Sequence, residues 1–359
     1  MAEFTTRILV TGATGYIGGS VLTEILQSSP VAKGSVSALV RRADQAEILR
    51  EHGVAPILFK GLDDLTALEE VASDFDVVIN CAIASHTESA IAMIKGQARL
   101  RERTGKDVHF IHTSGTSNLA DYPISGKYTE PRIFTDRDDD VFAYLKSREE
   151  MTTYPQRTTD IAVIETGVAT SVRTYIIMPP TIYGVGSGLF NKMSIQIPTL
   201  MRTAIAKGRA EVVGVGAARW SHVHIADLAP LYGILLCGML GGEGEQLGRG
   251  RGLVYGARGI YFAETGEHTW LELAEGVTRA GVELGVLQEP VPVSITLQQS
   301  ADQWGKGSLE YGELGWCSSS STRAVMSRDI GWKPTKGRRD FEESFVQEFK
   351  LILERSQKE

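Results

Sequence analysis

A strand, a glycine-rich turn and a helix stand at the start of this chain. Residues 8–10 form a short apolar run, which is typical of a strand buried on both faces. Gly12, Gly15 and Gly18 follow at a spacing of three, and residues compatible with a helix occupy 21–26. The N-terminus of such a helix presents unpaired N–H groups and the positive end of its dipole. This order of elements therefore predicts a site for the pyrophosphate of a dinucleotide.

Each glycine has its own role in such a turn. Gly12 lets the chain leave the strand tightly, Gly15 lets backbone N–H groups approach the pyrophosphate, and Gly18 lets the helix pack on the strand. A glycine-rich turn of no special function is the alternative interpretation of the triplet alone. The cofactor contacts predicted here are Gly12, Thr14, Gly15, Tyr16 and Ile17.

The spacing GxxGxxG in TGATGYIG resembles that of the extended and atypical short-chain dehydrogenase/reductases. Within them the chain looks most similar to the NAD-dependent epimerase/dehydratase-like proteins, and the resemblance extends to about Trp332. It implies an NADP-binding Rossmann core over 1–185. It also implies a mainly substrate-binding region over 186–359, with some segments that return to the core.

Regular alternation of strand and helix patterns continues through the first half. The strands are expected at 8–10, 35–40, 56–60, 76–80, 108–112 and 173–178, and the helices between them at 44–52, 65–73, 89–103 and from 142 to 168 with a break at Pro155. This pattern predicts a parallel, doubly wound α/β sheet with right-handed crossovers. Ligands of such sheets bind beyond the carboxyl ends of the strands.

The second half has a different rhythm and predicts a smaller α/β region. Residues 118–140 are expected to form a polar loop. The further elements expected are a helix at 192–207, strands at 211–215, 222–227 and 254–263, a glycine-rich loop at 241–252, and helices at 269–284 and 341–353.

Composition excludes several classes of protein. The 359 residues carry a net charge of −7, which argues against a nucleic-acid partner. The three cysteines are scattered, match neither a disulfide framework nor a zinc pattern, and suit a reducing compartment. The apolar stretch at 228–240 is too short to cross a bilayer, and no secretory signal pattern is present. We expect a cytoplasmic protein with a small-molecule substrate and no membrane partner, and a homodimer is compatible with the resemblance.

Arg41 and Arg42 follow the second predicted strand, where an acidic residue would bind the ribose hydroxyls of NAD. Cations at this place favour a 2′-phosphate, so the sequence predicts NADP(H) over NAD(H). Solvated surface arginines are the alternative. The resemblance further implies that Asp63, or Asp64 in a register shifted by one residue, contacts the adenine. It also implies that Ala82 lies against the cofactor and that Pro180 lies beside the nicotinamide.

Hydroxyl groups follow the fifth predicted strand in the segment HTSGTS. In the short-chain dehydrogenase/reductases that this chain resembles, a Ser or Thr at this place binds the substrate carbonyl. Gly115 falls where that family often has its catalytic serine, which leaves Ser114 and Thr116 as the candidates.

The proton donor of these reductases is the tyrosine of a Tyr-x-x-x-Lys pair, and no such pair occurs in this chain. Tyr144 is followed at four residues by Arg148, and Tyr154 is followed at three by Arg157. An arginine could lower the tyrosine pKa but cannot itself pass a proton. We expect one tyrosine to reach the nicotinamide, Tyr154 in preference to Tyr144, because the proline after Tyr154 starts a helix at the cleft.

Two further groups of polar residues have lesser roles. His222 and His224 share one face of a predicted strand, but no third ligand is evident and no metal is expected. Asn191, Ser194 and Gln196 lie where extended members of the family contact substrate.

The sequence thus predicts an NADP(H)-dependent oxidoreductase, of reductase or dehydrogenase type, acting on a carbonyl or alcohol of a small organic molecule. One alternative is an epimerase or dehydratase that recycles its cofactor. The other is a non-catalytic, NmrA-like sensor of dinucleotides, which the missing lysine favours.

Overall fold

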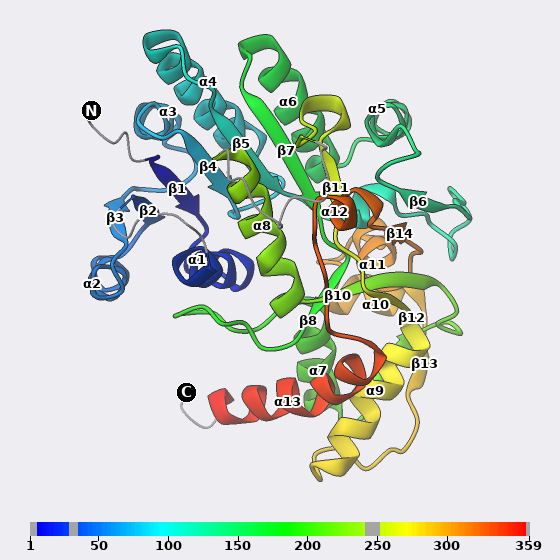
Figure 1. Ribbon diagram of the computed structural model, residues 1–359. Helices are drawn as coiled ribbons and strands as arrows, with labels where there is room; N and C mark the ends of the chain where they lie inside the picture. Colours follow the sequence, from blue (N-terminus) through cyan, green and yellow to red (C-terminus); the bar gives the residue numbers. More distant parts are fainter. Residues whose placement is uncertain (1–5, 29–34, 241–251, 357–359) are drawn as a thin grey trace.

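The computed structural model describes residues 6–28, 35–240 and 252–356. Seven parallel strands form its large sheet, in the order β3-β2-β1-β4-β5-β7-β11. The chain passes from one half of the sheet to the other between β3 and β4, so the two halves meet where β1 lies beside β4, and Figure 1 shows the strands in this order. The strands are β1 (Ile8–Thr11), β2 (Val36–Val40), β3 (Ala55–Leu58), β4 (Val77–Asn80), β5 (His109–Thr113), β7 (Arg173–Met178) and β11 (Ile260–Phe262). The predicted doubly wound parallel fold is confirmed.

Helices cover both faces of this sheet (Figure 1). On one face α3 packs against α4, and α4 packs against α6. On the other face α1 packs against α8. Every residue of β1 and β4 is buried, because central strands of a covered sheet have no face towards water. The helices are α1 (Tyr16–Ser28), α2 (Ala43–Glu51), α3 (Leu65–Ala72), α4 (Thr87–Thr104), α6 (Pro155–Thr170) and α8 (Ile225–Met239).

A second group of elements lies beyond the carboxyl ends of the large sheet (Figure 1). Its small sheets are β12-β10-β8, β13-β9 and β14-β6. The strands are β6 (Ile133–Thr135), β8 (Thr181–Tyr183), β9 (Glu211–Val213), β10 (Arg219–His224), β12 (Gly266–Thr269), β13 (Val293–Ile295) and β14 (Ser321–Arg323). The helices are α5 (Val141–Met151), α7 (Gln196–Lys207), α9 (Trp270–Glu283), α10 (Leu297–Gln303), α11 (Leu309–Trp316), α12 (Val325–Asp329) and α13 (Arg338–Ser356).

Several second-half elements differ from the sequence prediction. The strand expected at 222–227 ends at His224, because the His224 imidazole accepts a hydrogen bond from the Ala226 N–H at 3.0 Å and caps α8. The helix expected at 192–207 begins only at Gln196. In the strand expected at 254–263, only Ile260–Phe262 form a strand, β11, and a short 3-10 helix, Gly256–Arg258, precedes it. The glycine-rich loop, apart from Gly252, lies outside the described residues.

The polar loop expected at 118–140 contains β6, which pairs with β14 from the end of the chain. Buried Asp136 fixes this segment, since its carboxylate accepts hydrogen bonds from the backbone of Phe262, Val325 and Met326. Strand β11 comes from the second half and joins the large sheet. The division of domains near residue 185 stays a prediction.

Candidate active site

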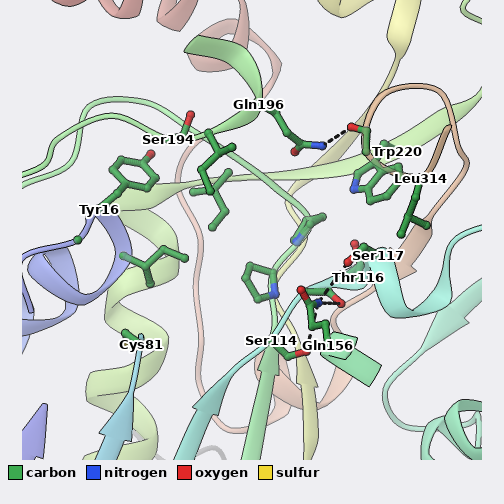
Figure 2. A pocket seen from close by; sticks show the side chains of 18 of the residues that line it. Tyr16, Cys81, Ser114, Thr116, Ser117, Gln156, Ser194, Gln196, Trp220 and Leu314 are labelled. Atoms are coloured by element: carbon green, nitrogen blue, oxygen red, sulfur yellow. Dashed lines mark hydrogen bonds between the residues drawn. The ribbon is translucent and has the colours of Figure 1, made fainter. Parts of the chain in front are cut away.

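A cavity of about 540 Å³ opens where β1, β4, β5 and β7 end (Figure 2). Figure 2 shows Ser114, Thr116, Ser117 and Gln156 gathered on one wall, with Tyr16 and Ser194 on another. Of the described residues that line the cavity, none carries a charge at neutral pH. Apolar and aromatic side chains make up much of the remaining wall, among them Ile17, Pro179, Pro180, Ile182, Met193, Ile195, Trp220, Tyr311 and Leu314.

The glycine-rich turn borders the cavity, and two of its glycines are required by packing. Gly12 has a φ of +68°, and a Cβ there would lie 2.3 Å from the carbonyl oxygen of Cys81. A Cβ on Gly18 would lie 2.3 Å from the Gly12 oxygen. Gly15 differs, because it lines the cavity and its Cβ would meet only the Gly12 oxygen, at 3.1 Å. The turn therefore leaves open, at Gly15, the place that a pyrophosphate needs.

The other predicted cofactor contacts fall into two groups. Tyr16, Ile17, Ala82 and Pro180 line the cavity together with Gly15, whereas Thr14 lies in the turn. The Tyr16 hydroxyl also donates to the Gly184 oxygen at 2.6 Å, which ties the turn to the segment after β8.

Arg41, Arg42 and Asp63 are not among the residues that line the cavity. Both arginines are exposed at the end of β2, and Arg42 forms an ion pair with Asp44. Asp63 is exposed after β3 and accepts a hydrogen bond from His86 Nε2 at 3.1 Å. This is the edge at which the adenosine of a dinucleotide would lie in a Rossmann domain.

A cluster of hydroxyl groups forms the wall beyond β5. Strand β5 ends at Thr113, and a 3-10 helix, η1 (Thr116–Leu119), follows. Thr116 Oγ1 is buried at the cavity and has no hydrogen-bond partner in the described part of the chain. Ser117 Oγ accepts from the Tyr154 hydroxyl and from Gln156 Nε2, both at 3.2 Å. Both bonds use lone pairs of Ser117, so its own hydrogen can point into the cavity.

Tyr154 lines the cavity at the start of α6, directly before Pro155. Burial raises the pKa of its hydroxyl, and the Arg157 guanidinium lowers it by less. That guanidinium lies 5.7 Å from the Tyr154 ring centroid, pairs with Glu149 at 3.0 Å and donates to the Asn118 oxygen at 3.1 Å. Tyr154 therefore remains protonated through the neutral range.

Tyr144 is placed elsewhere. Its hydroxyl accepts a hydrogen bond from Arg148 Nη1 at 3.1 Å and lies 3.3 Å from that of Tyr128. Burial raises the pKa of Tyr144 despite the arginine. Tyr144 does not line the cavity, although Arg148 does lie beside it as the spacing of four residues suggested.

Two residues, Gln156 on this wall and Asp160 buried behind it, were not found by the sequence reasoning. Gln156 Nε2 donates to the Gly115 oxygen at 3.1 Å and lies 3.0 Å from where a Cβ on Gly115 would be. Gly115 stands where the family often has its catalytic serine. The side chain that faces it is therefore the amide of Gln156 rather than the phenol of a tyrosine. Asp160, one turn further along α6, accepts a hydrogen bond from Ser114 Oγ at 2.6 Å. Gln156 and Asp160 lie four residues apart, which is the spacing of the tyrosine and lysine in Tyr-x-x-x-Lys. That spacing, taken with any polar residues at its two ends, indicates both.

On the opposite wall, two of the predicted substrate-contacting residues, Asn191 and Gln196, also form hydrogen bonds within the protein. Asn191 forms two hydrogen bonds with the backbone of Met193, both at 3.1 Å. Gln196 accepts from Thr181 Oγ1 at 3.0 Å and donates to the Gly315 oxygen at 2.9 Å. Both line the cavity with Ser194, so they shape it as well as facing it.

The two histidines of β10 pack within the fold. His222 stacks on Phe341 with ring centroids 4.2 Å apart, and its Nδ1 lies 3.2 Å from that of His268. Burial lowers the pKa of His222 to about 4. Among the described residues no group of three or more His, Cys, Asp or Glu could hold a metal ion, and no helix there is long and apolar enough to cross a membrane.

Comparison with known proteins agrees with this architecture. Residues 8–237 match the NAD-dependent epimerase/dehydratase family. The chain is similar to the oxidase ucsJ of Acremonium sp., with 32% identity over 92% of this chain and 93% of that protein. The protein described here therefore belongs to the NAD-dependent epimerase/dehydratase family, and the resemblance to extended short-chain dehydrogenase/reductases is confirmed.

Solved structures extend the likeness at the level of the fold. A double mutant of the dTDP-glucose 4,6-dehydratase DesIV from Streptomyces venezuelae, with NAD and DAU bound, superposes with a TM-score of 0.64. It is 16% identical, and the match covers 96% of this chain and 97% of that one. Vestitone reductase from alfalfa (Medicago sativa) has a TM-score of 0.58 and 16% identity, covering 96% and 98%.

Proposed function

We propose that this protein is an NADP(H)-dependent oxidoreductase acting on the carbonyl or alcohol group of an uncharged, largely apolar small molecule. The observation that carries the proposal is the cavity beyond β5, which combines a cluster of hydroxyls with aromatic and aliphatic walls and has no charged lining residue among those described. Such a cavity holds an apolar body and binds one polar group precisely enough to orient it.

The residues at the turn fit a nicotinamide dinucleotide. Tyr16 and Ile17, at the start of α1, would hold its pyrophosphate through backbone N–H groups, and Gly15 would let it approach, since the Gly15 N–H already donates to the Gly12 oxygen at 2.8 Å. Ala82 and Pro180 would contact the part nearer the substrate. When bound, such a cofactor supplies or accepts a hydride at the substrate carbon. The structures of similar fold with NAD bound support this assignment.

The protein's own part in the reaction is to bind the substrate oxygen and deliver a proton to it. Ser114 and Thr116 line the cavity, and their hydroxyls would hold the oxygen. Tyr154 would supply the proton, either directly or through Ser117, to which its hydroxyl donates. Because the Tyr154 pKa is raised, this proton is present throughout the neutral range.

The two alternative functions, an epimerase or dehydratase and a dinucleotide sensor, would require different residues in the cavity. An epimerase or dehydratase of nucleotide sugars would bind a diphosphate, for which cationic side chains are the usual partners; the described lining residues include none. A dinucleotide sensor needs no proton donor. Four residues after Tyr154, where the reductases have a lysine, this chain has the exposed Thr158, and the missing lysine favours the sensor.

The test is a screen of carbonyl compounds with NADPH, followed by loss of its absorbance. We expect turnover of neutral aromatic or aliphatic aldehydes and ketones, and none of carboxylated analogues or nucleotide sugars, because burying their charges in this cavity is unfavourable. Turnover of nucleotide sugars would instead support the epimerase/dehydratase alternative. NADPH binding by calorimetry with no turnover of any compound would support the sensor.

Cofactor preference provides a separate prediction. We expect NADPH to bind about tenfold more tightly than NADH, because a cation near the exposed end of β2 attracts the 2′-phosphate. Arg41→Ala should reduce this preference more than Arg42→Ala, since Asp44 already pairs with Arg42. Calorimetric titration of both cofactors against both variants measures the difference. Tighter binding of NADH by the unmodified protein would contradict the prediction.

A further inference from the structure

A buried polar cluster lies directly behind the hydroxyl wall of the cavity. Asp160 Oδ2 accepts hydrogen bonds from Ser114 Oγ and from Asn118 Nδ2, both at 2.6 Å. Asn118 Nδ2 also donates to Ser114 Oγ at 3.2 Å. On its other side, Asp160 Oδ1 lies 3.5 Å from His112 Nε2. Asp160 itself is inaccessible to solvent, whereas Ser114 lines the cavity, so Ser114 connects the buried carboxyl to any bound ligand.

The hydrogen-bond pattern fixes the protonation of His112. Thr11 Oγ1 donates to Asn80 Oδ1 at 2.6 Å, so Asn80 Nδ2 is the atom that donates to His112 Nδ1, at 3.1 Å. With Nδ1 as an acceptor, the neutral imidazole carries its proton on Nε2, the atom facing Asp160. His112 therefore cannot accept a proton from Asp160 in this tautomer, and Ser114 Oγ is the acceptor that a protonated Asp160 would use.

The groups facing Asp160 favour its protonated form. Burial raises the pKa of Asp160 to about 8, while the hydrogen bonds from Ser114 and Asn118 and the charge of Arg157 lower it by less. Burial lowers the pKa of His112 to about 4, so this side chain is neutral and offers no positive charge. Arg157 is already paired with Glu149. Tyr154, at the start of the same helix, stays neutral because burial raises its pKa.

We propose that Asp160 is a positioning residue whose protonation state sets the direction of the Ser114 hydroxyl and thereby decides whether Ser114 donates a hydrogen bond into the cavity or only accepts one. This inference rests on the proposed function for its consequence in catalysis, but the arrangement of Asp160 and Ser114 does not depend on it.

The two states follow from the number of hydrogens available. When Asp160 is ionised, it has no hydrogen to give, so the Ser114 hydroxyl donates to Oδ2. One lone pair of Ser114 Oγ then accepts from Asn118 Nδ2, and the second, which Gln156 Nε2 approaches at 3.5 Å, is the one that a ligand can use. When Asp160 is protonated, its own O–H can donate to Ser114 Oγ, and the Ser114 hydrogen turns towards the ligand. A carbonyl oxygen needs that hydrogen, whereas an alcohol can donate to the lone pair that Asn118 leaves and that Gln156 contacts only at 3.5 Å.

Carbonyl reduction should therefore be favoured below the pKa of Asp160 and alcohol oxidation above it. The expected size of the step is about three- to tenfold in kcat/KM, which corresponds to one neutral hydrogen bond. Neither Tyr154 nor Cys81 explains a step in this range, because burial raises the pKa of the former and brings that of the latter to about 12.

The first arm of the test uses the ligand-free protein. Infrared difference spectra across a pH titration should show the carbonyl stretch of a protonated carboxyl group that disappears as pH rises through about 8. The Asp160→Asn variant should lack this band. The Ser114→Ala variant should retain the band but shift its frequency, because the carboxyl loses its hydrogen-bond partner. Absence of a band that depends on Asp160 would overturn the proposal.

The second arm is the pH profile of kcat/KM for a neutral carbonyl compound that the screen finds to be reduced with NADPH. Both Asp160→Asn and Ser114→Ala should remove the step near pH 8. Glu348→Gln is the matched control: this buried carboxyl, whose pKa burial raises to about 7, contacts Ser194 on the other wall, so its loss should leave the step in place. A step that survives in Asp160→Asn, or one that disappears only in Glu348→Gln, would overturn the proposal.

The arms separate the two claims. An Asp160 band that shifts in Ser114→Ala, together with no turnover of any compound, would support the coupling and reject the reductase function. Turnover with a pH profile that neither variant changes would support the reductase and reject the role of Asp160. Should Asp160→Asn fail to fold, the Ser114→Ala spectrum and profile decide the matter, because that change removes the other end of the same hydrogen bond.

Discussion

Gly15→Val is expected to weaken dinucleotide binding by roughly a hundredfold or more while leaving the protein folded. A Cβ at Gly15 would be near only one backbone atom, the Gly12 oxygen at 3.1 Å, so a small shift accommodates it. The valine methyl groups would extend into the cavity, where backbone N–H groups must approach the pyrophosphate. Each charge-assisted hydrogen bond contributes about 1.5–3 kcal/mol, so loss of two weakens binding by roughly a hundredfold or more. Calorimetric titration with NADPH measures this directly.

The matched control is Gly337→Val. Gly337 precedes α13, far along the chain from the turn, and a Cβ there would meet no atom within 4 Å. This variant should bind NADPH as the unmodified protein does. Thermal unfolding of both variants checks that the fold survives. If Gly15→Val binds with unchanged affinity, the glycine-rich turn does not hold the dinucleotide.

The first half of the fold could be predicted because its signals are local. A buried parallel strand appears as a continuous apolar run, as in residues 77–79, and the glycines of the turn have a fixed spacing. Thr269 and Glu272 likewise stand three residues apart and form the capping box that starts α9. Each of these features is specified by residues within one turn or one strand of each other.

The second half depends on contacts between distant residues. Strand β6 pairs with β14, almost two hundred residues later, and three residues are too few to show a period. In the candidate site, Trp220 and Leu314 meet at one cavity although they lie on β10 and α11. Such juxtapositions come from tertiary packing, which no local pattern encodes.

Asp160 illustrates the same limit in a single residue. In the sequence it is an ordinary acidic residue within a helix, where a solvated position is the usual expectation. Only the structure shows that α6 turns it towards β5 and buries it against His112 and Ser114. Its altered pKa is a property of that burial and could not be foreseen from the residues beside it.

Tyr154→Phe is expected to reduce turnover by roughly a hundred- to ten-thousandfold, the usual contribution of a positioned proton donor. The variant keeps the aromatic ring in the cavity wall and loses only the hydroxyl that donates to Ser117 at 3.2 Å. NADPH affinity should therefore be unchanged, so the effect falls on kcat rather than on cofactor binding. Steady-state kinetics with a carbonyl compound that the protein reduces measures kcat, and calorimetric titration measures the affinity for NADPH.

Tyr144→Phe is the matched comparison, since it removes a tyrosine hydroxyl from the other candidate. That hydroxyl lies among Arg148, Tyr128 and the Leu119 backbone rather than at the cavity. Its loss should lower the free energy of unfolding by about 1 kcal/mol and leave turnover intact. If Tyr154→Phe remains fully active, the proton reaches the substrate from Ser114, Thr116 or an ordered water instead. If Tyr144→Phe alone is inactive, the cavity beyond β5 is not where the reaction occurs.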